Sequence, residues 1–444
     1  MKKLDGSEYL KRRQSLIQRL GDNSAIVLAS GREKIRNADT HFPFRVDSDF
    51  YYVTGFDEPD AIFVLRPGTD IGASILFCRP RDPAKEQWDG YRLGPEQAPS
   101  ELSIAKAFDI AEIDTKMPEL LNGVENFYYP IGRYDWLDRA VGRWQRTMKS
   151  KARAGVRAPQ TWADVDRLIH SMRSIKTAAE IEQMSVVAQI TAEAHQRAMS
   201  IAVPGIWEYQ LSAVLTYEFM HQGCQAAAYP SIVAGGNNAN ILHYVTNNQQ
   251  IEDGALVLID AGGELDGYAA DVTRTFPING RFSEAQRQVY EIVLDAQLQA
   301  IDVIKPGVAF DQFHKVAVKV LVEGLHTLGL LEGNVEESIE NEVYKRFYMH
   351  RTGHFLGMDV HDVGSYKDRD KWHDLKPGMV VTVEPGLYIP DAPDIPEQYR
   401  GIGIRIEDDI VVTAKGNQNL TLAAPKTIDD IEQLMANAKQ RRLP

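Results

Sequence analysis

The sequence is poor in cysteine, since only Cys78 and Cys224 occur in 444 residues. Disulfides form in oxidising compartments, and a secreted protein of this size usually carries more cysteines. We therefore expect two free thiols and a cytoplasmic location. A single disulfide between the two residues is the alternative.

Long apolar runs and an excess of positive charge are also absent. No stretch approaches the ~18 apolar residues that cross a bilayer. The first residues, MKKLDGSEYLKRRQSL, carry charges with no apolar segment behind them, unlike a signal peptide. The formal net charge of −13 disfavours nucleic acid and anionic membrane surfaces. We expect neither as a partner.

The apolar content, 44% of the residues, is enough for a large core, and the length predicts two domains. The first part alternates strand-like and helical patterns, which is typical of an α/β domain. Strands are expected at 24–30, 61–68 and 73–80, and a helix at 99–109.

The domain boundary is expected within a long helical pattern at 161–202. Thr177, followed by Glu180 three residues later, forms a helix-start signal there. We therefore divide the chain into residues 1–174 and 175–444.

The second part combines helical patterns with two hairpin-like pairs of strands, so the whole chain is predicted to be of mixed α/β (α+β) class. The hairpins resemble each other, because six residues separate the glycine from the carboxylate in both GALVLID and GMVVTVE, a weak internal repeat. Helices are expected at 178–202, 207–222, 283–304 and 309–328, and the paired strands at 255–260 with 268–276 and at 379–388 with 402–412.

The first hairpin brings Asp260 and Asp271 to one face of two apolar strands. A turn centred between Leu265 and Asp266 puts the two side chains directly opposite each other, and a turn one residue later makes them diagonal neighbours. Like charges in a partly buried setting repel each other and are costly to desolvate. A divalent metal between them is favoured over Arg274 as the compensating charge.

The second hairpin adds Glu384 and Glu407, and histidines cluster in MHRTGHFLGMDVHDVG. Four carboxylates and one histidine balance the charge of two divalent ions. An oxygen-rich set of this kind suits Mn²⁺ best, while zinc, cobalt or iron can also bind. Two such ions can activate a bridging water and polarise a carbonyl, which is the chemistry of hydrolysis.

Five segments in this order and spacing resemble the pita-bread metallopeptidases, and within them the aminopeptidase P (Xaa-Pro aminopeptidase) group. They are ILHY, VLIDAGGELDGYAADVTRTFP, HRTGHFLGMDVHDVG, TVEPGLY and YRGIGIRIEDD, and NADTHFPFRVDSDFYYVTGF resembles the N-terminal domain of that group. The resemblance implies a pita-bread catalytic domain with a pseudo-two-fold antiparallel sheet. It also implies an N-terminal domain for oligomerisation and substrate-length selection.

The resemblance also implies a role for each matching residue. Asp260 chelates one ion, Asp271 and Glu407 bridge both, and His354 and Glu384 bind the other. Glu384 additionally passes a proton from the attacking water, held as a bridging hydroxide, to the leaving nitrogen.

Further residues would contact the substrate: His243 and His361 hold the scissile carbonyl, and His350, Arg405 and Tyr388 line the proline side. Members of the group form tetramers in which a tryptophan reaches a neighbour's site, and Trp88 matches it, so a homotetramer (or homodimer) is expected. Asp39 and Arg153 match positions for subunit contacts or chain-length selection. Gly353 departs from the pattern, where a small polar residue is expected, and we expect little effect.

The function implied is release of the N-terminal residue from peptides with proline second. The nearest rival is prolidase, which shares the ligands but cleaves only Xaa-Pro dipeptides. Methionine aminopeptidase usually lacks so large an N-terminal domain. A non-catalytic peptide-binding protein, or a metal-free creatinase-like hydrolase, would lack the ligands that are present here.

Overall fold

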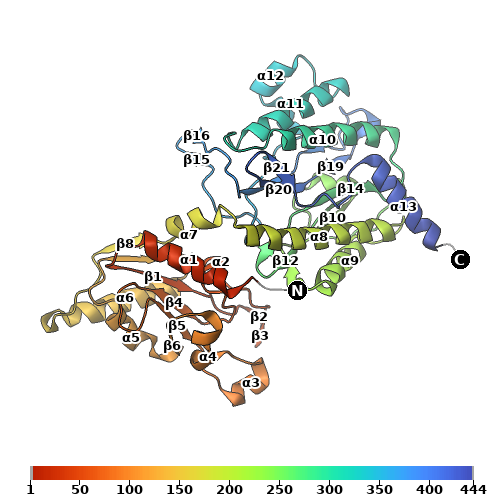
Figure 1. Cartoon of the computed structure of the whole chain (residues 1–444). Helices are drawn as coiled ribbons and strands as arrows, with labels where there is room; N and C mark the ends of the chain where they lie inside the picture. Colours follow the sequence, from red (N-terminus) through yellow and green to blue (C-terminus); the bar gives the residue numbers. More distant parts are fainter. Residues whose placement is uncertain (1–3, 443–444) are drawn as a thin grey trace. The chain divides into compact units, whose positions relative to one another are not determined.

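The computed structural model describes residues 4–442 and divides the chain into two compact units between Arg173 and Ser174 (Figure 1). The break falls beside the boundary expected from the sequence. The helix expected to start after Thr177 does so, with a reciprocal capping box between Thr177 and Glu180. Each unit is described separately.

The N-terminal unit is built on one mixed sheet of six strands in the order β6-β5-β4-β1-β7-β8. The β1–β4 and β4–β5 pairs are antiparallel, and the other three pairs are parallel. The strands are β1 (Ser24–Ala29), β4 (Ile62–Leu65), β5 (Ser74–Cys78), β6 (Lys106–Asp109), β7 (Asn126–Tyr129) and β8 (Thr161–Asp164); β2 (Ile35–Asn37) and β3 (Thr40–His41) form a separate small hairpin.

Helices cover this sheet, and α5 and α6 pack on one face through buried side chains such as Met117, Leu137 and Trp144. The prediction of a helix at 99–109 is wrong for the second half of that segment. Ser103 adopts a left-handed conformation (φ +52°) that ends α4, and the chain then enters β6 beside β5. The helices are α1 (Gly6–Arg19), α2 (Ser48–Thr54), α3 (Pro83–Asp89), α4 (Gly94–Leu102), α5 (Ile113–Leu120), α6 (Asp135–Ser150) and α7 (Asp166–Arg173).

The C-terminal unit places short strands between two groups of helices. In Figure 1 the strands lie between α10 and α11 on one side and α8, α9 and α13 on the other. The four helices expected from the sequence are confirmed within a few residues. The helices are α8 (Ala178–Ile201), α9 (Glu208–His221), α10 (Glu284–Asp302), α11 (Gln312–Thr327), α12 (Val335–Glu340) and α13 (Ile428–Arg442).

Both expected hairpins are present, and each is split into two short strand pairs that keep one register. The first comprises β11 with β14 and β12 with β13, and the second comprises β17 with β20 and β18 with β19. Their strands are β11 (Leu256–Asp260), β12 (Gly263–Leu265), β13 (Tyr268–Ala269), β14 (Thr273–Pro277), β17 (Val380–Val383), β18 (Gly386–Tyr388), β19 (Gly403–Arg405) and β20 (Asp408–Val412). The expected mixed α/β class is confirmed.

Strands β9, β10 and β21 extend these hairpins, and β15 and β16 form a separate two-stranded sheet. The remaining strands of the unit are β9 (Ala226–Ala227), β10 (Ile232–Gly235), β15 (Lys367–Asp368), β16 (Lys371–Trp372) and β21 (Asn417–Asn419). Cys78 and Cys224 are free and buried, and burial raises the pKa of each thiol to about 12. Among the helices within residues 4–442, none is long and apolar enough to cross a bilayer.

Candidate active site

Asp260 and Asp271 meet where the first hairpin splits. Asp260 pairs with Thr273 in the ladder, so Asp260 and Asp271 are diagonal neighbours, as one of the two expected registers requires. The backbone is very close at this point, because a Cβ on Gly262 would lie 1.7 Å from the carbonyl oxygen of Ala270. Glycine at 262 therefore allows the bend that brings the two carboxylates together.

Glu384 and Glu407 occupy the corresponding break in the second hairpin. The ladder runs from Val383 with Asp408 to Gly386 with Arg405, which leaves the two glutamates between the paired strands. Pro385 follows Glu384 and has no N–H for a ladder bond, which is consistent with a break here.

Thr273 joins the two hairpins at the acidic residues. Its carbonyl oxygen accepts the backbone N–H of Glu407 at 3.1 Å, and its hydroxyl donates to the carboxylate of Glu407 at 2.6 Å. The carboxylates of the two similar hairpins are thereby held in one place.

His354 faces this group with one ring nitrogen. Its Nε2 lies 3.4 Å from Asp271 and 3.8 Å from Glu384, while Nδ1 donates to the carbonyl oxygen of Phe355 at 2.9 Å. Burial lowers the pKa of His354, but the hydrogen bond to Asp271 and the charge of Glu384 raise it to about 9. The bond at Nδ1 orients Nε2 for a ligand, as backbone carbonyls do for metal-binding histidines.

The four carboxylates and His354, which we call the acidic cluster, carry negative charge that nearby cations do not fully balance. Burial and the charges of Asp271, Glu384 and Asp260 raise the pKa of Glu407 well above its ordinary value. Its buried Oε1 has no hydrogen-bond partner among the described residues. Ligand atoms of Asp271, His354 and Glu407 lie within 4.8 Å of one another. A buried oxygen-rich cluster with an unpartnered carboxylate oxygen fits divalent metal ions.

Glu384 and Asp260 complete the acidic cluster and share its electrostatics. Burial raises the pKa of Glu384 to about 7, although the charges of His354 and Arg405 oppose the rise. Burial also raises the pKa of Asp260, against the charge of Arg405, whose Nη2 lies 2.6 Å from its carboxylate.

Tyr229 contacts the site but was not found from the sequence. Its hydroxyl lies 2.6 Å from Asp260 and also hydrogen-bonds to Asp271. Burial and the two neighbouring carboxylates raise the pKa of Tyr229 well above its ordinary value, so the phenol keeps its proton. Tyr229 lies 31 and 42 residues before its partners, so no local motif connects it to them.

His350, Tyr388 and Arg405, predicted to line the proline side, form one hydrogen-bonded chain. Burial and the charge of Arg405 lower the pKa of His350 to about 3, so the ring is neutral. Its Nδ1 lies 2.8 Å from the carbonyl oxygen of Arg351 and donates to it, which leaves Nε2 to accept from Tyr388 at 2.8 Å. Arg405 donates to the Tyr388 hydroxyl at 2.9 Å.

His361 and His243, predicted to hold the carbonyl, lie at the edge of the cluster. The ring of His361 packs edge-on against that of His354 with centroids 4.5 Å apart. Burial and the charge of His354 lower the pKa of His361, and His243 contributes in the same direction. Both side chains are exposed.

Trp88 belongs to the other unit, where it is 87% exposed on α3. Asp39 and Arg153 are also exposed in that unit. Their expected contacts with a second subunit stay predictions.

Gly353 proves to be more constrained than we expected. A Cβ at this position would lie 2.0 Å from the carbonyl oxygen of Thr382, the residue whose hydroxyl accepts the backbone N–H of His354 at 3.1 Å. A polar side chain would therefore push β17 away from His354. Glycine at position 353 is therefore coupled to the local packing of the site.

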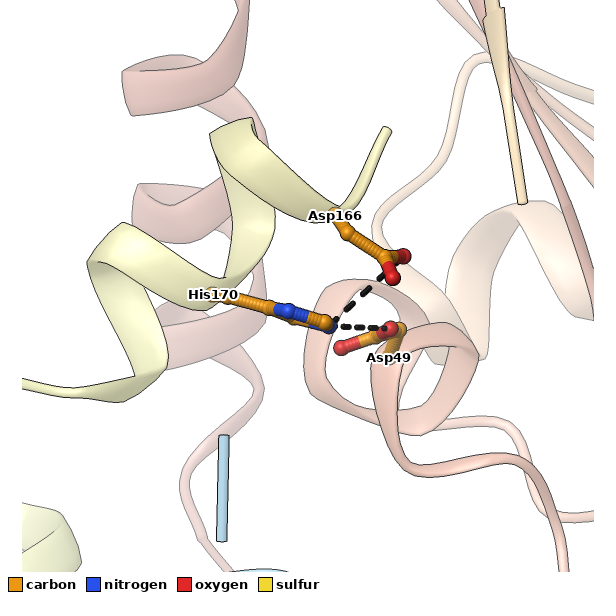
Figure 2. A group of neighbouring side chains, drawn as sticks. All are labelled: Asp49, Asp166 and His170. Atoms are coloured by element: carbon orange, nitrogen blue, oxygen red, sulfur yellow. Dashed lines mark hydrogen bonds and ion pairs between the residues drawn. The ribbon is translucent and has the colours of Figure 1, made fainter. Parts of the chain in front are cut away.

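A second group of possible ligand atoms, Asp49, Asp166 and His170, lies in the N-terminal unit (Figure 2). His170 Nε2 is 3.1 Å from Asp49 and 3.6 Å from Asp166. Asp49 also binds Arg133 and Arg173, each at 2.7 Å. Two fixed guanidinium groups already neutralise this carboxylate, so we interpret the group as an ion-pair cluster rather than a metal centre.

Comparison with known proteins identifies the family. The model of metallopeptidase family M24 matches residues 182–414, and that of the aminopeptidase P N-terminal domain matches residues 9–128. The Xaa-Pro aminopeptidase of Escherichia coli (strain K12) is 42% identical over 442 residues, covering 99% of this chain and 100% of the relative.

Solved structures agree with this assignment. Aminopeptidase PepP of Pseudomonas aeruginosa superposes with a TM-score of 0.97 at 48% identity, covering 99% of this chain and 100% of that one. Zinc-substituted aminopeptidase P of E. coli in complex with product gives a TM-score of 0.96 at 43% identity, with 98% and 99% covered. The expected pita-bread fold is confirmed, and the chain belongs to metallopeptidase family M24, with an aminopeptidase P N-terminal domain ahead of its catalytic unit.

Proposed function

We propose that the protein removes the N-terminal residue from peptides whose second residue is proline, with two divalent metal ions bound at the acidic cluster. The metallopeptidase family and the Xaa-Pro aminopeptidase relatives support this activity. The single observation that carries the metal requirement is the buried Oε1 of Glu407, which has no partner among the described residues and lies among like charges. The ligands are Asp260, Asp271, His354, Glu384 and Glu407.

The residues of the cluster divide the chemistry between them. When bound, the two ions lower the pKa of water and polarise the scissile carbonyl. Glu384 takes the proton of the attacking water and delivers it to the leaving nitrogen. His243 and His361 hold the carbonyl oxygen as charge develops on it.

The chain of His350, Tyr388 and Arg405 forms the wall for proline. Its hydrogen bonds of 2.8 and 2.9 Å fix the two rings, whose centroids lie 5.5 Å apart. The two rings are inclined to each other by 58°, and their fixed positions define the shape of the side on which proline is proposed to lie.

An assay with matched peptides tests the activity and separates it from prolidase. We expect hydrolysis of Xaa-Pro-Xaa tripeptides, and little hydrolysis of Xaa-Ala-Xaa controls. Prolidase instead requires the Xaa-Pro dipeptide. Cleavage of the dipeptide alone, or equal cleavage of proline and alanine peptides, would contradict the proposal.

The native metal is proposed to be Mn²⁺, because the ligand set has four carboxylates and one imidazole. The zinc-substituted relative is a reason to compare metals directly. Exhaustive chelation should abolish activity, and addition of Mn²⁺ should restore it better than zinc, cobalt or iron. Activity that survives chelation would refute the metal requirement.

The assembly is proposed to be a homotetramer (or homodimer) in the cytoplasm, with the N-terminal unit selecting substrate length. The support is the exposure of Trp88 and Tyr91, 87% and 92%, and the two free thiols. Sedimentation analysis should give the tetramer mass. A monomer with full activity would contradict a role for Trp88 at a neighbouring site.

A further inference from the structure

The loop that carries His243 converges on one buried carboxylate, that of Glu208. Glu208 is the first residue of α9, and its exposed fraction is 0%. The loop runs from residue 236 to residue 250, and its only regular segment is a 3₁₀ helix at Gly236–Asn240. His243 lies beyond that helix, and its side chain is exposed.

Glu208 accepts four hydrogen bonds, one from the last residue of β10 and three from this loop. Oε1 accepts from the backbone N–H of Gly235 at 2.8 Å and from the side chain of Asn238 at 2.9 Å. Oε2 accepts from the hydroxyl of Tyr244 and the backbone N–H of Gln249, both at 2.9 Å. The donors lie on both sides of His243, and Tyr244 is its direct neighbour.

The four bonds satisfy a carboxylate that is otherwise costly to bury. Its place in the first turn of α9 adds the favourable interaction of a negative charge with a helix N-terminus. The side chain of His243 makes no hydrogen bond to another described residue, so the position of its ring depends on the backbone around it. Glu208 fixes that backbone.

We propose that Glu208 is a positioning residue, whose carboxylate closes the 236–250 loop and thereby sets His243 relative to the metal cluster. The inference rests on the proposed function, in which His243 holds the scissile carbonyl. Glu208 is not one of the proposed metal ligands or substrate contacts. Its effect on catalysis passes through the loop.

The first test is hydrogen exchange in the metal-loaded Glu208→Gln enzyme. Glutamine offers an N–H₂ group where one oxygen accepted two hydrogens, so about two of the four bonds are lost. Gly235 donates to Oε1 and Gln249 to Oε2, so the new N–H₂ group removes the acceptor of one of these two amides. That amide should exchange about 10- to 100-fold faster, because hydrogen bonds to charged groups are among the stronger ones. The matched control, Glu218→Gln on the same helix, should leave these amides unchanged.

The second test is a double-mutant cycle on kcat/KM with an Xaa-Pro-Xaa peptide. If Glu208 acts through His243, Glu208→Gln should lower kcat/KM, and adding Glu208→Gln to His243→Ala should cause little further loss. Metal content should stay at the wild-type value in every variant. Tyr244→Phe removes one of the four bonds and should give a smaller change in the same direction, which keeps the test decisive if Glu208→Gln fails to fold.

Wild-type exchange rates for the amides of both Gly235 and Gln249 in Glu208→Gln would overturn the proposal. So would a double mutant in which the fold-loss of kcat/KM equals the product of the losses in Glu208→Gln and His243→Ala. The failure of the proposed function is a separate result. It would appear as wild-type kcat/KM in His243→Ala, and the exchange measurement would still decide whether Glu208 closes the loop.

Discussion

The stability of the metal-free protein should depend on pH through His195, a residue buried in α8. Its Nε2 lies 3.1 Å from the carbonyl oxygen of Ala261, and its Nδ1 is buried with no hydrogen-bond partner among the described residues. A protonated ring would place a positive charge in a fully buried position, which is costly. Burial lowers the pKa of His195 from 6.5 to about 4.

The sign and size of the effect follow from this difference in pKa. Between pH 6.5 and about 4 the unfolded chain binds the proton and the native protein does not. The contribution of His195 is therefore fully present above pH 6.5 and is lost as the pH falls toward 4. A fall in pKa of this size corresponds to about 3 kcal/mol of unfolding free energy.

Urea unfolding of the chelated protein at several pH values measures this contribution. His195→Gln removes the titrating group and keeps an N–H₂ that can donate to Ala261. The unfolding free energy of the wild type relative to this variant should fall by about 3 kcal/mol between neutral pH and about pH 4. His221→Gln, an exposed histidine of α9, is the control and should follow the wild type. Parallel curves for wild type and His195→Gln would refute the reasoning.

Three further substitutions test the site and its support. Gly262→Ala places a Cβ 1.7 Å from the carbonyl oxygen of Ala270, so the variant should bind less metal than the wild type. Elemental analysis of the purified variant measures this, and full metal content would contradict the tight bend. Lys176→Met removes the ammonium group that lies 2.8 Å from the buried carboxylate of Asp362, so urea unfolding should show a loss of up to about 3–5 kcal/mol in unfolding free energy. An unfolding midpoint equal to that of the wild type would argue against this ion pair as a support. Glu384→Ala removes a proposed ligand and the proton carrier together, so kcat should fall at least about 100-fold even in excess Mn²⁺, and a near-normal kcat would overturn that assignment.

The acidic cluster could be predicted because its residues have a local signature. Asp260 and Glu384 each end an apolar strand, and Asp271 and Glu407 lie at the start of the returning strands. A carboxylate at the end of an apolar strand is unusual, and four of them on two similar hairpins indicate that they form one site. The sequence did not distinguish a direct from a diagonal pairing of Asp260 and Asp271, because the turn from Glu264 to Gly267 can be centred in more than one way.

Residues that act through distant contacts left no such signature. Glu208 bonds to Gln249 across 41 residues, and Tyr229 bonds to Asp271 across 42. A glutamate at the start of a helix looks like an ordinary favourable charge, and a tyrosine before a proline looks like a loop residue. Only the folded chain shows that Glu208 is buried and Tyr229 half-buried, each among polar partners.

The helix expected at 99–109 shows a different limit. Apolar residues there fit a helical spacing, but Ile104 and Ala107 are buried next to a strand pairing that the local sequence does not specify. The parallel partner, β5, is supplied from residues about thirty positions earlier. Pairing with β5 therefore outweighs the local preference of these residues for a helix, and they form β6.

A buried cation, Arg274, binds the strand segment that carries Glu407. Arg274 is fully buried, and it donates to the carbonyl oxygen of Glu407 and to the carboxylate of Asp408, both at 2.6 Å. Lys426 binds the other oxygen of Asp408 at 2.6 Å. Asp408 is thus paired with two cations, whereas the buried Oε1 of Glu407 has no hydrogen-bond partner among the described residues. Arg274 and Lys426 pair with Asp408, and Arg405 pairs with Asp260. The charge of Glu407 is therefore left for the proposed divalent ions to balance.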